Sequence, residues 1–75
     1  MKRLSELRIG KRAIIRAFEK EEHSIKLMEM GCIPGEIIRV AKIAPLGDPI
    51  SVYVAGYNLS LRLDEAKNIF LEELF

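Results

Sequence analysis

The sequence has no tryptophan and only one cysteine and one histidine, and these shortages exclude several kinds of protein. Cys32 cannot form an internal disulfide, although secreted domains of this size usually need disulfides to support a small core. We therefore expect a reducing, cytoplasmic environment. With His23 as the lone histidine and no glycine-rich phosphate loop, no nucleophile, base and orienting group can be assembled. We predict that the protein is not an enzyme and has no catalytic residues.

Long apolar runs are missing as well. No stretch approaches the roughly 18 apolar residues of a membrane-spanning helix. The basic residues near the N-terminus are not followed by the apolar run of about 7–15 residues that a signal peptide has. We therefore expect no direct membrane insertion, so that any role in a membrane process is carried out from the cytosolic side.

What the sequence does contain is typical of one small folded domain. Its 75 residues are 49% hydrophobic and 31% charged, which argues against disorder. A domain of this length has a thin core, and a deep substrate pocket would compete with that core for the same side chains. We expect residues 1–75 to form a single domain that works by binding a partner.

The charge is nearly balanced overall but uneven along the chain. The net charge is +1, which disfavours nucleic acid as a partner. Residues 1–16 nevertheless contain six cations and one acid, Glu6: the cations are Lys2, Arg3, Arg8, Lys11, Arg12 and Arg16. This run is either an ordinary solvated surface or a basic face for an acidic partner or an anionic membrane.

Turn signals divide the chain into short segments, which favours a small β-barrel. The alternation of apolar residues predicts five strands, at residues 11–18, 36–44, 50–54, 59–62 and 69–74. Gly31 and the Pro34-Gly35 pair separate the first two, the pair being typical of a type II turn. A short amphipathic helix is expected over residues 23–31, and a one-turn helix capped by Asp64 before the last strand. This order of elements predicts a mostly β, five-stranded barrel of the SH3 type.

Three segments, taken in order, resemble a known family. They are Leu27-Met28-Glu29-Met30-Gly31-Cys32-Ile33-Pro34-Gly35, then Ala44-Pro45-Leu46-Gly47-Asp48-Pro49-Ile50, then Gly56-Tyr57-Asn58-Leu59-Ser60-Leu61-Arg62 followed by Glu65-Ala66. Together they are similar to the FeoA family of ferrous-iron transport proteins, over a stretch from Leu4 to about Phe70.

The resemblance implies an SH3-like barrel in the cytosol that assists FeoB, the membrane transporter for Fe²⁺ with a cytosolic GTP-binding domain. The same barrel forms the C-terminal domain of metal-dependent repressors of the diphtheria-toxin-repressor type, which carry a winged-helix DNA-binding domain ahead of it. Because this sequence starts with the barrel, we expect the transporter accessory. The alternative is a stand-alone regulatory module of such a repressor system.

The family's link with a transition metal ion raises the question of a metal site. His23, Met28, Met30 and Cys32 lie within ten residues and could form a soft site. Met28 and Met30 are two apart and cannot share a helix face, so core filling is the expected role of both. We expect Cys32 to be a small buried hydrophobe, and we predict neither a metal site nor a cofactor.

Two residues are candidates for contact with a partner. Tyr57 sits at a turn, where it is either a contact anchor or a lid over one end of the barrel. Arg62 belongs to the family signature and either pairs with Asp64 or Glu65 or faces a partner. Without tryptophan, a groove for a polyproline helix is poorly supplied. Open barrel edges would also allow a weak homo-oligomer.

Overall fold

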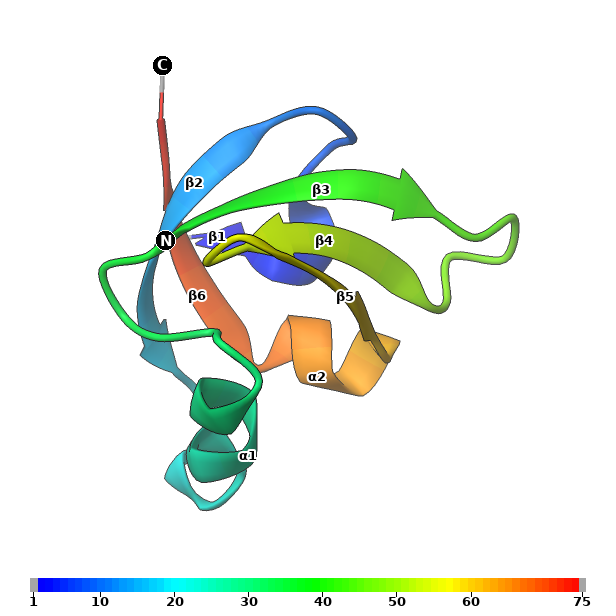
Figure 1. Ribbon diagram of the computed structural model, residues 1–75. Coiled ribbons are helices and arrows are strands. Elements are labelled where there is room, and N and C mark those ends of the chain that lie inside the picture. The colour runs from blue at the N-terminus through cyan, green and yellow to red at the C-terminus, as the bar shows by residue number, and fades with distance from the viewer. Residues whose placement is uncertain (1, 75) are drawn as a thin grey trace.

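The computed structural model describes residues 2–74, which form a six-stranded antiparallel sheet that curls strongly on itself (Figure 1). The strand order across the sheet is β1-β6-β2-β3-β4-β5, so that β1 and β5 are its edges. The strands are β1 (Lys2–Arg3), β2 (Arg12–Phe18), β3 (Ile37–Ile43), β4 (Ile50–Val54), β5 (Tyr57–Leu61) and β6 (Ile69–Glu73).

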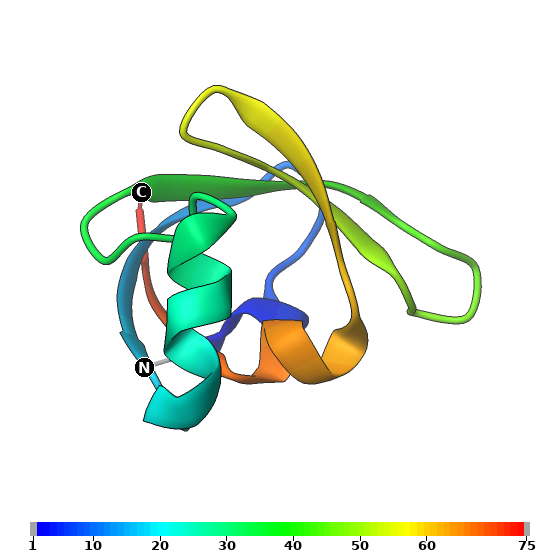
Figure 2. The ribbon, with the colours of Figure 1, turned by 60° about the horizontal axis from the view of Figure 1, so that its bottom comes forward.

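Short helices connect these strands. Two are 3₁₀ helices, η1 (Leu4–Glu6) and η2 (Glu21–His23), and two are α-helices, α1 (Ser24–Glu29) and α2 (Leu63–Lys67). Figures 1 and 2 show α1 and α2 at the same end of the curled sheet. Within residues 2–74, no helix is long and apolar enough to span a membrane.

All five strands predicted from the sequence are present. The additional strand, β1, has two residues, too few for an alternating pattern to reveal it. The turn before β5 is shorter than expected, because Ala55 (φ +52°) and Gly56 (φ +82°) reverse the chain by themselves. A two-residue hairpin with positive φ at both positions matches the twist of its strands. Tyr57 therefore begins a strand and does not lie in the turn.

The link from α1 to β3 forms as the sequence predicts. Gly31 follows the helix with a φ of +107°, in the region that favours glycine. The backbone N–H of Glu36 donates to the carbonyl of Ile33 at 2.9 Å, and Gly35 between them has a φ of +98°, as a type II turn requires.

The start of α2 differs from the prediction. Asp64 was expected to cap this helix, but the helix already begins at Leu63 and Asp64 lies in its first turn. The exposed N–H of Arg62 donates instead to Glu65 Oε1 at 2.8 Å. Asp48 Oδ1 accepts from the N–H of Leu63 at 3.1 Å, which ties the helix start to the loop between β3 and β4.

Fifteen apolar residues of the described chain fill the inside of the curled sheet. They follow the predicted alternation most clearly in β4, where Ile50, Val52 and Val54 all point inward. Leu4 and Leu7, three apart, close one side of the core from η1 and its end. The set is Leu4, Leu7, Ala13, Ile15, Leu27, Cys32, Ile38, Val40, Ile50, Val52, Val54, Leu61, Ala66, Ile69 and Leu71.

Candidate functional site

A cleft of about 500 Å³ lies between the η2–α1 segment and α2. Leu27 is the one described lining residue of an apolar type, and the carbon atoms of the other, polar or charged residues supply much of the wall. The lining residues are Glu19, Lys20, His23, Lys26, Leu27, Asp64, Glu65, Lys67 and Asn68. We call this the helix cleft.

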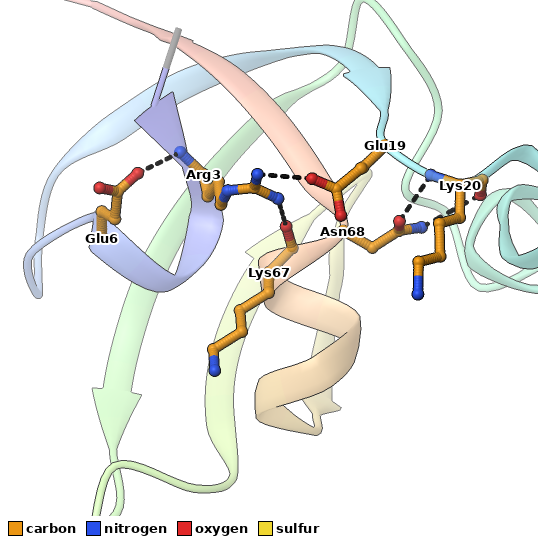
Figure 3. Close-up of polar contacts among 6 residues, drawn as sticks. All are labelled: Arg3, Glu6, Glu19, Lys20, Lys67 and Asn68. Atoms are coloured by element: carbon orange, nitrogen blue, oxygen red, sulfur yellow. Dashed lines mark hydrogen bonds and ion pairs between the residues drawn. The ribbon is translucent and has the colours of Figure 1, made fainter.

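Asn68 fixes one end of the helix cleft. It follows the last residue of α2, and its side chain is buried. Its Oδ1 accepts the backbone N–H of Lys20 at 2.8 Å, and its Nδ2 donates to the Lys20 carbonyl at 3.4 Å (Figure 3). The Asn68 carbonyl also accepts the N–H of Glu19 at 2.9 Å. These bonds hold the end of β2 against the end of α2, so the cleft has a defined wall.

Arg3 ties the same corner together from β1 (Figure 3). Its Nη1 donates to the carbonyl of Lys67 at 2.7 Å, and its Nη2 donates to Glu19 Oε1 at 2.5 Å. The guanidinium also lies 4.8 Å from the centre of the Phe70 ring. The hydrogen bond lowers the pKa of the Glu19 carboxyl and raises the pKa of Arg3, so both groups stay charged at neutral pH.

A second ion pair spans the helix cleft. Lys26 Nζ of α1 lies 3.4 Å from Glu65 Oε2 of α2, while the other oxygen of Glu65 accepts the Arg62 N–H. His23 lies at the rim, with its Nε2 3.8 Å from Glu22 Oε1, and both side chains are well exposed. The cleft therefore carries both cations and carboxylates.

The four residues considered for a soft metal site do not come together among the described residues. Within residues 2–74, no three His, Cys, Asp or Glu side chains are grouped so that they could hold a metal ion. His23 precedes α1, whereas Cys32 follows its other end and is fully buried. Burial, with a smaller effect from the charge of Glu65, raises the pKa of the Cys32 thiol to about 11. Cys32 is thus a buried, protonated thiol, as the sequence predicts.

Met28 and Met30 have different environments. Met30 packs against the core, which confirms its predicted role. Met28 is 36% exposed, so its prediction as a core residue is wrong. The reason is that α1 turns only its Leu27 and Met30 side inward, which leaves Ile25 and Met28 on the outer side.

Tyr57 and Arg62 lie at opposite ends of β5 and do not form one cluster. Five residues of strand span about 17 Å. Tyr57 is 66% exposed, which argues against a lid over the barrel end. Arg62 is exposed, and no ion pair of its side chain occurs in the part of the chain that the structure describes. The contacts of Arg3, Glu19 and Asn68 could not be predicted from the sequence, because their partners are distant along the chain.

Known proteins of one family are similar to this chain in sequence and in fold. The FeoA domain family model matches residues 2–73. A protein of Porphyromonas gingivalis (strain ATCC BAA-308 / W83), named Fe(2+) transport protein A/Fe(2+) transporter FeoB fusion protein, is 39% identical over 71 residues. That match covers 93% of this chain but only 8% of the fusion protein, so the chain corresponds to a small part of that relative.

Two solved structures agree with the barrel. Iron(II) transport protein A from Clostridium thermocellum is 40% identical, with a TM-score of 0.90 and coverage of 97% of this chain and 46% of that one. FeoA of Stenotrophomonas maltophilia, solved with zinc and described as a prokaryotic SH3 domain protein, is 27% identical. Its TM-score is 0.81, with 96% and 91% of the two chains covered. The predicted SH3-like barrel is confirmed.

The same fold occurs in transcriptional repressors. A manganese-dependent transcriptional repressor superposes with a TM-score of 0.87 over 97% of this chain and 36% of the repressor. The two sequences are only 18% identical, so this likeness establishes the shared fold and nothing more.

Proposed function

The chain belongs to the FeoA domain family, and we propose that it is a cytoplasmic accessory protein of ferrous-iron transport by a FeoB-type transporter. It binds the transporter's cytosolic GTP-binding region and shifts the conformational or nucleotide state of that region. The observation that carries the proposal is the Porphyromonas gingivalis fusion protein, in which an FeoA-like sequence and a FeoB transporter share one chain. Fusion keeps two parts at a high effective concentration, as expected for parts that contact each other.

The surface chemistry supports a binding role. Most residues that line the helix cleft are of charged or polar type, and the ion pair of Lys26 and Glu65 spans it. We propose Tyr57 and Arg62, both exposed and at the two ends of β5, as contacts with the transporter. Edge strand β5 connects them and leaves one side of its backbone available for pairing.

Uptake of ferrous iron by cells provides the functional test. A strain that lacks the gene for this chain but keeps the transporter should take up ferrous iron more slowly, and the chain supplied in trans should restore the rate. A strain that lacks the transporter should show no response to the chain. Normal uptake in the strain that lacks only this chain would refute an accessory role.

The second candidate function is a regulatory module of a metal-dependent repressor system. It comes from the family resemblance of the sequence, since a fold shared at 18% identity with the manganese-dependent repressor does not assign a role. This alternative requires association with a DNA-binding protein that depends on the metal. Size-exclusion chromatography with such a repressor, with and without Mn²⁺, tests it, and a complex that forms only with the metal would favour it over the transport role.

A further inference from the structure

Three side chains form a row on the outer face of the sheet. Arg12 of β2 lies opposite Arg39 of β3, and Arg39 lies opposite Tyr53 of β4. Residues directly opposite each other on neighbouring strands point to the same face. Their chain neighbours, among them Ala13, Ile38 and Val52, are buried, so the row faces outward. Together with Ile37 and Ala55, the row lines a shallow groove of about 290 Å³, which we call the sheet groove.

The sheet groove combines apolar surface with an ordered cation. Ile37 is 48% exposed and Tyr53 is 42% exposed, both large for strand residues in the middle of a sheet. The Arg39 guanidinium lies 5.8 Å from the centre of the Tyr53 ring. That contact holds the guanidinium against the sheet while its N–H groups remain free to donate. Tyrosine and arginine are, with tryptophan, the residue types that most often dominate protein interfaces.

Among residues 2–74, the two arginines of the sheet groove have no ion-pair partner. Three other cations near the sheet have carboxylate partners: Lys2 lies 2.9 Å from Glu73, Arg16 lies 2.8 Å from Glu72, and Arg3 is paired with Glu19. Across residues 2–74, no carboxylate lies within ion-pair distance of Arg12 or Arg39. The pairing thus neutralises half of the basic N-terminal run and leaves positive charge at the groove.

Lys42 extends this charge along β3. A register shift between Val40 and Lys42 places Lys42 opposite Ser51, on the outer side of the sheet, and it has no ion pair within the described residues. Three cations therefore follow one face of β2 and β3, although the chain carries a net charge of only +1.

We propose that the sheet groove binds an acidic segment of a partner protein, with carboxylates on Arg12 and Arg39 and an apolar side chain against Ile37 and Tyr53. Because the groove is positively charged, its occupant should carry negative charge. The exposed apolar floor favours a peptide. Recognition of an anionic membrane typically uses clusters of about 4–8 basic residues, and nucleic acid needs several phosphate contacts. The partner's identity as the transporter rests on the proposed function, whereas the chemistry of the groove does not.

Titration of the chain with a peptide, monitored through its amide NMR signals, tests the chemistry of the groove without the transporter. The probe is a short synthetic peptide that alternates glutamate with leucine, and its counterpart carries lysine in place of glutamate. The acidic peptide should shift amide signals of β2, β3 and β4 around Arg39, and added salt should weaken the effect. The lysine peptide should leave these signals unchanged.

Two double variants distinguish the effect of the groove itself from the effect of the chain's net charge. Arg12→Gln with Arg39→Gln should weaken binding of the acidic peptide by about tenfold or more. Lys2→Gln with Arg16→Gln removes the same charge from two cations that already have carboxylate partners, and should leave the affinity unchanged. Equal losses in both double variants, or no shifts near Arg39 with the unmodified chain, would overturn the inference.

Other occupants give distinct results. Binding to phosphatidylserine vesicles without binding to the acidic peptide would assign the face to a membrane and overturn the proposal. Concentration-dependent changes at the same amides without any peptide would assign it to a second copy of the chain, again against the proposal. If the acidic peptide binds at the groove but the transporter does not bind the chain, the proposed function fails while the groove chemistry stands.

Discussion

Asn68 and Lys20 are 48 positions apart and are joined by two hydrogen bonds, between the side-chain amide of Asn68 and the backbone N–H and C=O of Lys20. The Asn68 side chain accepts from the N–H of Lys20 and donates to its carbonyl, as a neighbouring strand would do (Figure 3). One buried amide thereby connects the end of β2 to the end of α2. The shape of the helix cleft depends on this connection.

Replacement of Asn68 by alanine should therefore destabilise the fold. The Lys20 N–H would lose its partner in a partly buried position, at a cost of about 1–3 kcal/mol in the free energy of unfolding. Urea unfolding measures the loss. Asn58→Ala, at an exposed position of β5, is the matched control and should change the stability by about 0.5 kcal/mol or less. Equal losses in the two variants would contradict the role assigned to Asn68.

The ion pair of Arg3 and Glu19 should make stability depend on pH in the acid range. The hydrogen bond from Arg3 lowers the pKa of Glu19 in the folded state. A carboxyl with a lowered pKa stabilises the fold above its unfolded pKa, about 4.3, and loses this effect as the pH falls through the lower, folded pKa. The urea midpoint of Glu19→Gln should therefore lie below that of the unmodified chain at neutral pH, and the difference should shrink in acid.

The control for this prediction is the same substitution in an Arg3→Gln background. With the guanidinium gone, Glu19→Gln should no longer produce a difference that depends on pH. A pH-dependent difference of the same size in both backgrounds would show that Arg3 is not its cause.

Cys32 should resist alkylation in the folded protein. With a pKa of about 11, only about one thiol in a thousand is a thiolate at pH 8, and the side chain is fully buried as well. Iodoacetamide should therefore react slowly with the native chain and rapidly with the chain in urea, as mass spectrometry can follow. Fast labelling under native conditions would mean that Cys32 is accessible, and Cys32 would then be a candidate metal ligand again.

Local patterns in the sequence were sufficient for most of the fold. The alternation in residues 50–54 identifies the inward side of β4, and Pro34-Gly35 identifies the type II turn, because each depends only on neighbouring residues. Asp64 shows the limit of such reasoning. A good capping residue is present, but the helix begins two residues earlier than a cap at Asp64 would place it, and the side chain of Glu65 accepts the N–H of Arg62.

Much less of the candidate sites could be predicted from the sequence. The helix cleft depends on Arg3 meeting Lys67 and Glu19, and the sheet groove depends on Arg12, Arg39 and Tyr53 lying opposite one another. Both relationships arise from strand register and from contacts between distant segments. The prediction that Met28 is a core residue was wrong for a related reason. Helical spacing shows which residues share a face, but it does not show which face the sheet covers.

The proposed contacts at the ends of β5 can be tested by substitution. Tyr57→Ala and Arg62→Ala should each reduce the affinity for the transporter, by about fivefold or more for a residue that carries interface energy. Because both side chains are exposed, the unfolding free energy should change little. Binding is measured by biolayer interferometry with the transporter in detergent, and Asn58→Ala is the control. Unchanged affinity in both variants would place the contact surface elsewhere.

The central claim is that this chain binds a FeoB-type transporter, and co-purification tests it most directly. The tagged chain is incubated with membranes that contain the full transporter, in the presence of GDP, of a non-hydrolysable GTP analogue, or of no nucleotide. The account predicts that the transporter is retained on the tagged chain and that the amount retained differs between nucleotide states. Retention equal to that of an untagged control under all three conditions would contradict it.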